Sequence, residues 1–278
     1  MDDLKRYEEL VKTIEYHNDR YYNQDDPEIS DYEYDMMMKE LKKIEKDHPE
    51  FVTPNSPTQH VGGSAKREAG VLVRHRVPML SLQDVFSKEE VQDFVKSMQE
   101  TLVDPVFVVE YKIDGLSMAL RYENGLLTTA ITRGDGIIQG EDVTVNAKVI
   151  KDVKNKLKEP IEYLEVRGEV YMTNEAFDKV NEIQELNNKK TFANPRNCAA
   201  GTLRQLDSRI TKQRNLSMFI FNIQDIRGKE ITSHSQGYEY LKIQGMKVID
   251  NYQVCHNFEE VWKAIEMIGE SRDQLGYD

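Results

Sequence analysis

Three charged side chains stand two residues apart in the stretch VVEYKIDGLSMALRYENG, residues 108–125. In an extended chain successive side chains point to opposite faces, so Glu110, Lys112 and Asp114 would share one face. Such a row is ordinarily the solvated face of a strand. Here the acid is followed by Gly115, which permits a tight turn and close approach of the backbone to a ligand. The spacing therefore has a second interpretation, a reactive lysine between two carboxylates.

A lysine amine is a nucleophile only after it has lost its proton. Neighbouring carboxylates favour the charged amine and oppose that loss while no ligand is bound. We therefore expect Lys112 to react only when a substrate fills the site. From these residues alone, the solvated strand and the reactive lysine both stay open.

The composition is that of a soluble globular protein. The chain has 278 residues, of which 39% are hydrophobic and 31% charged, enough for one large domain or two unequal ones. No apolar run approaches the roughly 20 residues that span a bilayer. The N-terminal MDDLKRYEEL lacks the apolar core of a secretory signal. Cys198 and Cys255 lie far apart in the sequence, so neither a disulfide framework nor a zinc site is expected. The expected location is the reducing cytoplasm.

The formal charge of −12 bears on partners. Nucleic-acid binding usually depends on a basic surface that releases phosphate counterions. If DNA is a substrate, we expect tight binding to need parts that are not in this sequence.

The first part of the chain predicts a small helical module, which we place at residues 1–66. Apolar residues recur at helical spacing within 3–22. Ser30 and Glu33 form a capping-box pattern that would begin a second helix, ending near residue 46. Prolines and a Gly-Gly pair within 50–78 indicate a linker.

Residues 67–278 predict a second domain of the α+β class, with antiparallel sheet and helices between the strands. A further capping box, Ser87 with Glu90, would begin a helix of about 14 residues. The apolar period then changes from 3.6 to 2. Strands are predicted at 106–113, 116–122, 126–132 (after an Asn124-Gly125 hairpin), 163–172, 216–223 and 246–251. Helices are predicted at 174–187, 196–206, 234–244 and 258–270.

EYKIDG resembles the KxDG motif of nucleotidyltransferases, which include DNA ligases, RNA ligases and mRNA capping enzymes. TRGDG, EVRGEVYM, PMLSLQDVF and FANPRNCAAGTLRQLD narrow the resemblance to bacterial NAD⁺-dependent DNA ligases, over essentially the whole chain. The resemblance implies a nucleotidyltransferase (ATP-grasp-like DNA ligase) domain after the helical module. It also implies that Lys112, beside Asp114, attacks the α-phosphorus of NAD⁺ and keeps AMP as a phosphoamide while NMN leaves.

The resemblance assigns the other matched boxes to the nucleotide. The expected contacts are Glu110 near the adenine, Glu169 at the ribose, Arg133 at the adenylate, Phe221 stacked on the base, and Ser81 and Leu82 lining the pocket. Arg196 and Arg204 are candidate phosphate contacts, and Gly134 and Gly136 suit a backbone nest for an anion. A plain turn, a half-exposed strand and a capped structural helix are the alternatives for these boxes.

YYNQDDPEISDYEYD resembles the NMN-binding element that NAD⁺-dependent ligases have and ATP-dependent ones lack. The matched positions are Tyr21, Tyr22, Asp31, Tyr34 and Asp35. Aromatic faces and carboxylates attract a flat cation such as nicotinamide. Alternatively, the acids favour the helix dipole and the tyrosines pack between helices. The two readings are compatible.

The sequence departs from the family pattern in three places. Ile137, Ile138 and an additional Gln139 stand where the family usually has two threonines, and Phe221 stands where it often has a tyrosine. The sequence stops at LGYD, before the family's IDGxVxK strand. We therefore expect this sequence to be the adenylation region of a longer, cytoplasmic bacterial ligase that acts in DNA replication and repair. On its own, the region is expected to be a monomer, to bind nicked DNA weakly or not at all, and not to seal it.

Mg²⁺ is expected to assist at the substrate phosphates, without a fixed site built from protein alone. A module that binds NAD⁺, NMN or an inhibitor without turnover is the alternative.

Overall fold

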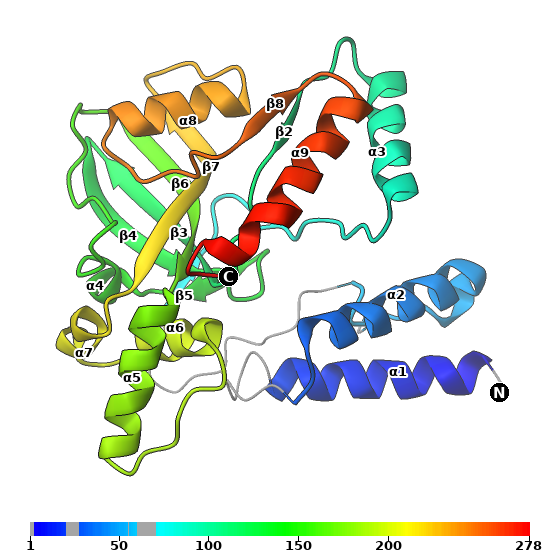
Figure 1. Ribbon diagram of the computed structural model, residues 1–278, viewed down its shortest axis with the longest axis horizontal. Coiled ribbons are helices and arrows are strands. Elements are labelled where there is room, and N and C mark those ends of the chain that lie inside the picture. Colours follow the sequence, from blue (N-terminus) through cyan, green and yellow to red (C-terminus); the bar gives the residue numbers. More distant parts are fainter. Residues whose placement is uncertain (1–2, 21–27, 55, 60–70) are drawn as a thin grey trace. The chain divides into compact units, whose positions relative to one another are not determined.

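The computed structural model describes residues 3–20, 28–54, 56–59 and 71–278 (Figure 1). The chain forms two compact units. The helix–loop unit comprises Met1–Ser81 and Arg133–Asp142, and the sheet unit comprises Leu82–Thr132 and Val143–Asp278. Helices and antiparallel strands are mixed as the sequence predicts, so the α+β prediction is confirmed. Within the described ranges no helix combines the length and apolarity needed to cross a bilayer.

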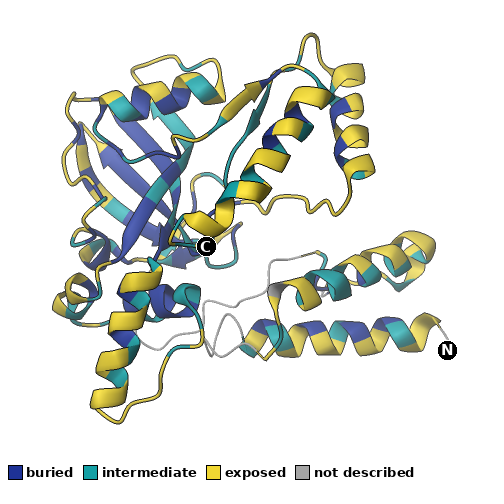
Figure 2. Ribbon diagram, in the orientation of Figure 1, coloured by how far each residue is buried: buried dark blue, intermediate teal, exposed yellow. Residues whose placement is uncertain are grey.

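Two helices dominate the helix–loop unit, α1 (Asp3–Asn18) and α2 (Asp31–Asp47). Tyr7, Leu10 and Ile14 on α1 pack with Leu41 on α2, forming a small core of their own. Figure 2 shows buried and half-buried positions alternating with exposed ones along both helices. The spacing of apolar residues thus predicted α1 correctly where the structure describes it.

The predicted capping box at the start of α2 is confirmed. The backbone N–H of Glu33 donates to Ser30 Oγ at 3.2 Å, and the N–H of Ser30 donates to Glu33 Oε2 at 2.8 Å. These two bonds satisfy amides that the first helical turn would otherwise leave without partners.

The segment predicted as a linker contains regular structure, so that prediction is wrong in part. A 3₁₀ turn covers Pro49–Phe51, and β1 (Leu72–Arg74) pairs antiparallel with β5 (Gln139–Glu141). The strand β1 has three residues, too short for a period-2 pattern, and it forms because a distant segment supplies its partner. The predicted domain boundary at residue 66 lies outside the described residues.

An antiparallel four-stranded sheet, in the order β4-β3-β6-β7, forms the sheet unit's centre. Its strands are β3 (Leu116–Glu123), β4 (Leu126–Thr132), β6 (Tyr163–Tyr171) and β7 (Ser217–Arg227). The predicted hairpin between β3 and β4 is confirmed, with Asn124 at φ 50° and Gly125 at φ 78°. Two successive positive φ angles are what a tight two-residue hairpin requires.

The two faces of this sheet differ in chemistry. Met118, Val166 and Met218 lie on a face that packs into the main hydrophobic core with the helices around it. The alternate residues of these strands point to the opposite face and include polar pairs across the ladder. Ser117 pairs with Glu169, and Arg121 pairs with Glu165. The polar face is where a ligand could meet charged groups.

Five helices follow the strands of the sheet: α4 (Thr144–Ala147), α5 (Asn174–Leu186), α6 (Pro195–Leu203), α7 (Ser208–Gln213) and α8 (His234–Ile243). The helix predicted at 196–206 is confirmed as α6, and the short α7 that follows it was not predicted. Asp207 begins α7 by accepting the backbone N–H of Arg209, so the chain changes direction after α6. Helices α6 and α8 both contribute to the main core, α6 with Cys198, Ala199 and Leu203 and α8 with Tyr238, Tyr240 and Leu241.

A smaller layer combines the strands β2 (Phe107–Val109) and β8 (Gln253–Cys255) with the helices α3 (Lys88–Thr101) and α9 (Phe258–Ser271). Two strand predictions are corrected here. The strand expected at 106–113 ends at Val109, because β8 offers only a three-residue partner. The strand expected at 246–251 is replaced by β8, and Val248 makes only an isolated bridge to Ile220.

Candidate nucleotide site

The KxDG segment, residues 110–114, leaves β2 and enters β3 without ladder pairing. Ile113 is buried and packs with Tyr111 in a small apolar cluster, whereas Lys112 between them is exposed. Gly115 makes the turn possible, since a Cβ there would lie 2.0 Å from the carbonyl oxygen of Val170. The alternation expected from the sequence therefore persists, although the strand does not.

Glu169 lies on the polar face of the sheet and is held by its neighbour across the ladder. Ser117 Oγ donates to Glu169 Oε2 at 2.7 Å, and Arg167 Nη2 donates to the same hydroxyl at 3.2 Å. Burial raises the pKa of Glu169 to about 7, although the Ser117 hydroxyl and the positive charges of Lys112 and Arg167 act in the opposite direction. Lys112 is thus near enough for its charge to act on this carboxyl.

Asp114 connects the KxDG segment to the FANPR box. Arg196 Nη1 lies 3.2 Å from Asp114 Oδ1. Arg196 stands in the first turn of α6, which Asn194 caps by accepting the N–H of Asn197. Burial lowers the pKa of Arg196 to about 10, so the guanidinium is still charged at neutral pH. Two boxes that are 82 residues apart in sequence thus meet through one ion pair.

Phe221 lies beside Arg167 because β7 is irregular there. The register shifts between Arg167 and Gly168, so that Phe221 is the extra residue of β7. Gly168 accommodates the shift, since a Cβ on it would lie 2.3 Å from the carbonyl oxygen of Phe219. The Arg167 guanidinium is 5.4 Å from the centre of the Phe221 ring, within cation–π range.

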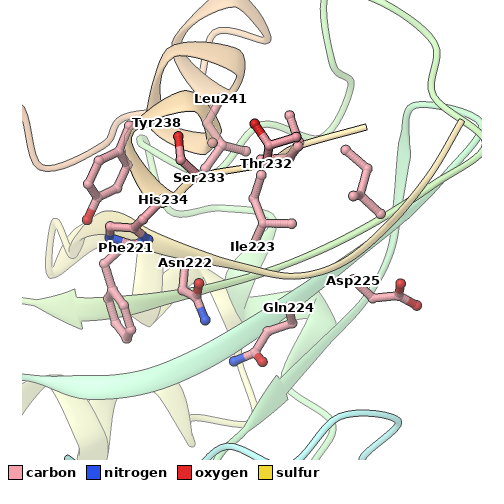
Figure 3. A pocket seen from close by; sticks show the side chains of 13 residues that line it. Phe221, Asn222, Ile223, Gln224, Asp225, Thr232, Ser233, His234, Tyr238 and Leu241 are labelled. Carbon is pink, nitrogen blue, oxygen red and sulfur yellow. The ribbon is translucent and has the colours of Figure 1, made fainter. Parts of the chain in front are cut away.

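Glu110 is bound by two side chains of α8. Tyr238 donates its hydroxyl to Glu110 Oε2, and His234 Nε2 lies 3.2 Å from the same oxygen. A pocket of about 510 Å³ opens beside them, lined by residues 221–226 of β7, by residues 231–234, and by Gly237, Tyr238 and Leu241 of α8 (Figure 3). Phe221 and Glu110 are both predicted to contact the base. Phe221 lines this pocket, and Glu110 is bonded to two of its lining residues, His234 and Tyr238.

In the helix–loop unit, Arg133 and Ser81 are also brought together. Arg133 Nε donates to the carbonyl of Met79 at 3.0 Å, and its Nη2 donates to Ser81 Oγ. His75 Nε2 lies 2.7 Å from the carbonyl oxygen of Arg133. Leu82, the other predicted residue of this box, belongs to the sheet unit and is 73% exposed.

The described contacts around Gly134 and Gly136 favour the alternative, a plain turn, over an anion nest. Both residues have positive φ, 56° and 76°, as the predicted nest requires. The amides are occupied, however: Asp135 Oδ1 accepts three N–H groups, from residues 137–139, and the amides of 135 and 136 bond to Gln139 and Arg133 carbonyls. Burial disfavours the charged carboxyl, but these three donors hold the pKa of Asp135 below its usual value.

The predicted NMN-binding positions are described only in part. Tyr34 on α2 is half-buried, packs against the helical core and donates its hydroxyl to Asn18 Oδ1 at 2.7 Å. Asp35 follows it and is half-buried, and Asp31 is the first residue of α2. Tyr21 and Tyr22 lie outside the described residues. The packing alternative thus applies to Tyr34, and the binding role of the set stays a prediction.

Four residues of the site were not found by sequence reasoning: Ser117, Arg167, His234 and Tyr238. The first two could have been suggested by the alternation of β3 and β6, which places polar residues opposite each other on one face. The last two give no signal, because they lie 124 and 128 residues after Glu110.

Comparison with known sequences assigns both parts of the chain. The sequence model of the NAD-dependent DNA ligase adenylation domain matches residues 70–278, and that of the DNA ligase-like, N-terminal NAD+-binding domain matches residues 1–62. The chain therefore belongs to the NAD-dependent DNA ligase family.

Curated relatives agree with this assignment. A DNA ligase from Clostridium kluyveri is 55% identical over all of this chain and 42% of its own length. DNA ligases from Caldicellulosiruptor saccharolyticus and Clostridioides difficile are 51% and 47% identical over 99% and 97% of this chain, each over 40% of its own length. The chain thus spans about two fifths of the length of these relatives.

Proposed function

We propose that this chain accepts AMP from NAD⁺ on Lys112. Lys112 Nζ, after losing a proton, attacks the α-phosphorus of NAD⁺; a P–N bond forms, the pyrophosphate bond breaks, and NMN leaves with the bonding electrons. The observation that supports this most is the exposed Lys112 amine, which is near enough for its charge to act on Glu169 while its neighbours Tyr111 and Ile113 are packed. An exposed amine of this kind can reach a ligand, whereas a lysine tied into an ion pair could not.

The other groups of the sheet unit bind and orient the adenylate. Glu169, held by Ser117, accepts hydrogen bonds from the ribose hydroxyls, and Phe221 provides a flat apolar face for the base. Asp114, two residues after the lysine, is held in an ion pair with Arg196. These contacts are made by side chains already fixed by packing or ladder pairing, which reduces the ordering cost of binding.

The helix–loop unit supplies contacts of two kinds in this proposal. Arg133 and Ser81, already bonded to each other, bind the adenylate together with Leu82. The helical module binds the NMN half through Tyr21, Tyr22, Asp31, Tyr34 and Asp35. The family match of residues 1–62 to an NAD⁺-binding domain supports this second role.

Magnesium enters only as a charge partner of the substrate. Among the described residues, no group of three or more His, Cys, Asp or Glu side chains could hold a metal ion. In this proposal Mg²⁺ is held largely by the phosphates, where it neutralises their charge.

Adduct formation tests the proposal directly. After incubation with NAD⁺, we expect intact-mass analysis under denaturing conditions to show one AMP per chain, with an equal amount of NMN released. Lys112→Ala should abolish both signals. Lys96→Ala, which removes a lysine that is 72% exposed on α3, should leave both unchanged. NAD⁺ binding by calorimetry without adduct or NMN release would instead favour the module that binds without turnover.

We also propose that the longer protein seals nicked DNA, using a local basic segment of this chain. Seven of the residues between 189 and 214 are basic and one, Asp207, is acidic, in a chain of net charge −12. The basic residues are Lys189, Lys190, Arg196, Arg204, Arg209, Lys212 and Arg214. Such a segment can contact DNA phosphates although the whole chain is acidic.

Salt dependence would test this second proposal. In the full-length ligase, Arg204→Ala should lower affinity for nicked DNA and reduce the slope of log K against log salt by about one. Unchanged DNA affinity and slope would contradict a phosphate contact at this position.

A further inference from the structure

The carboxylate of Glu110 is held on one side. The Tyr238 hydroxyl and His234 Nε2 both reach Glu110 Oε2. Among the residues that the structure describes, no hydrogen bond ends on the second oxygen, Oε1. One oxygen of the carboxylate is therefore anchored, and the other can accept a hydrogen bond from a ligand.

Tyr238 is a rigid anchor. Its ring is 1% exposed and lies between those of His234 and Tyr252, with ring centres 4.6 Å and 5.0 Å away. Burial, with the negative charge of Glu110 beside it, raises the pKa of Tyr238, so the phenol stays protonated and donates. A fixed ring places a fixed donor, and this in turn fixes one carboxylate oxygen.

The backbone of Glu110 is fixed independently of its side chain. Glu110 directly follows β2, whose last residue, Val109, pairs with Gln253 on β8. The β2–β8 ladder therefore sets where the Cα lies, and α8 sets where the carboxylate points. A group held at both ends pays little conformational entropy when a ligand binds.

The pocket beside this carboxylate has a volume and a lining that suit a purine. Its volume of about 510 Å³ is in the range of small-molecule sites. Phe221 contributes an aromatic ring to the lining, and His234 and Tyr238 belong to the same wall (Figure 3). Adenine presents an exocyclic N–H donor at its edge, which a carboxylate oxygen accepts. Hypoxanthine presents a carbonyl oxygen at the same place, which a carboxylate repels.

We propose that Tyr238 and His234 are positioning residues, which aim Glu110 at the exocyclic amine of the base and so set a preference for adenine over hypoxanthine dinucleotides. The inference rests on the proposed function, because it concerns the base of the same NAD⁺. It assigns to α8 a role in base selection in addition to its packing against the sheet.

A ratio of affinities tests this inference. Calorimetry would measure Kd for NAD⁺ and for its deaminated analogue, nicotinamide hypoxanthine dinucleotide, with wild type, Tyr238→Phe and Tyr252→Phe. The Tyr252 hydroxyl donates to Glu239 at 3.1 Å, so Tyr252→Phe is a matched control. We expect the preference for NAD⁺ to fall about tenfold in Tyr238→Phe, the loss of one hydrogen bond to a charged group, and to stay unchanged in Tyr252→Phe.

A purely structural role would give a different result. If Tyr238 only supports packing, Tyr238→Phe weakens both dinucleotides equally and leaves the ratio unchanged, which overturns the inference. His234 gives a second test on an exposed side chain, 36% accessible. His234→Leu should reduce the ratio and His234→Gln, which retains a donor, should restore it; if Tyr238→Phe fails to fold, an unchanged ratio in His234→Leu overturns the inference.

The outcomes also separate this inference from the proposed function. Wild-type chain that forms the AMP adduct from NAD⁺ and the corresponding IMP adduct from the hypoxanthine analogue without preference overturns base selection by Glu110 and leaves nucleotidyl transfer in place. Wild-type chain that binds neither dinucleotide and forms no adduct overturns both.

Discussion

Two short segments contain Asp-Gly, KIDG at residues 112–115 and RGDG at residues 133–136. Their charged side chains have opposite structural roles. In RGDG, Asp135 accepts three backbone N–H groups and Arg133 bonds to Met79 and Ser81, so the charged groups build the turn itself. In KIDG, the glycine makes the close backbone approach and Lys112 is left exposed. Similar sequences therefore form a self-contained turn in one case and present an exposed lysine in the other.

The difference arises from where each segment obtains its backbone hydrogen bonds. The RGDG loop obtains them locally from an aspartate, whereas the KIDG segment is fixed by β2 before it and β3 after it. When the backbone of a segment is fixed at both ends, its side chains are not needed to hold the turn and are available to bind a ligand. The predictions that follow test this contrast.

The largest effect is expected at Gly115. A Cβ there would lie 2.0 Å from a backbone carbonyl, so Gly115→Ala should force the strands apart and cost about 3 kcal/mol or more of unfolding free energy. Chemical denaturation measures it. Gly269→Ala on α9, where a Cβ meets nothing within 4 Å, should stabilise the chain by up to about 1 kcal/mol. Equal effects of the two substitutions would contradict the close approach at Gly115.

Glu169 should make stability fall as pH rises. Its pKa in the folded chain is about 7, above the ordinary value of 4.5, so the folded state binds more protons between these values. The unfolding free energy should therefore decrease from about pH 4.5 to 7, by no more than about 3 kcal/mol. Glu169→Gln removes the ionisation and should flatten this part of the pH profile. A wild-type profile identical to that of Glu169→Gln would show that the carboxyl is not perturbed.

Asp135 should make stability fall as pH decreases, the opposite of the effect expected for Glu169. Its pKa is lowered in the folded chain. The contribution of its charge to the unfolding free energy is therefore fully present above the ordinary pKa and is lost as pH falls through the lowered pKa. Asp135→Ala leaves three amides without their acceptor and should cost about 1–3 kcal/mol at neutral pH. The loss should diminish in acid, as measured by denaturation at several pH values. A pH-independent loss would indicate that the charge of Asp135 is irrelevant to the turn.

The smallest effect is expected in the helical module. His48 lies 3.2 Å from Glu50 and 3.1 Å from Asp3, and these acids raise its pKa above the ordinary value. Its stabilising contribution is therefore present at low pH and is lost as pH rises through the raised value. His48→Gln should lower Tm slightly at pH 5.5 and not at pH 8.5. An equal shift at both pH values would contradict the charged pair.

Sequence reasoning succeeded where the signal is local. The Ser30–Glu33 box and the Asn124-Gly125 hairpin depend on neighbours in sequence, and both are found as predicted. It failed where a distant partner decides. β1 forms because β5 pairs with it, β2 stops where β8 stops, and no local pattern encodes either event.

The candidate site divides in the same manner. The exposure of Lys112 follows from alternation, which the sequence shows directly. The bonds from Ser117 to Glu169 and from Arg196 to Asp114 depend on register and on a helix start 82 residues away. Asp135 also shows a limit of motif reading, because its contacts in a loop rich in glycine favour a self-contained turn over an anion nest.

The central claim is that the Lys112 amine is the group that receives AMP. Incubation with NAD⁺, digestion and tandem mass spectrometry would locate the modification by fragmentation of each adenylated peptide. The account predicts AMP on Lys112 and on no other residue, with no modified peptide from Lys112→Ala. AMP found on a different residue, or retained by Lys112→Ala, would contradict it.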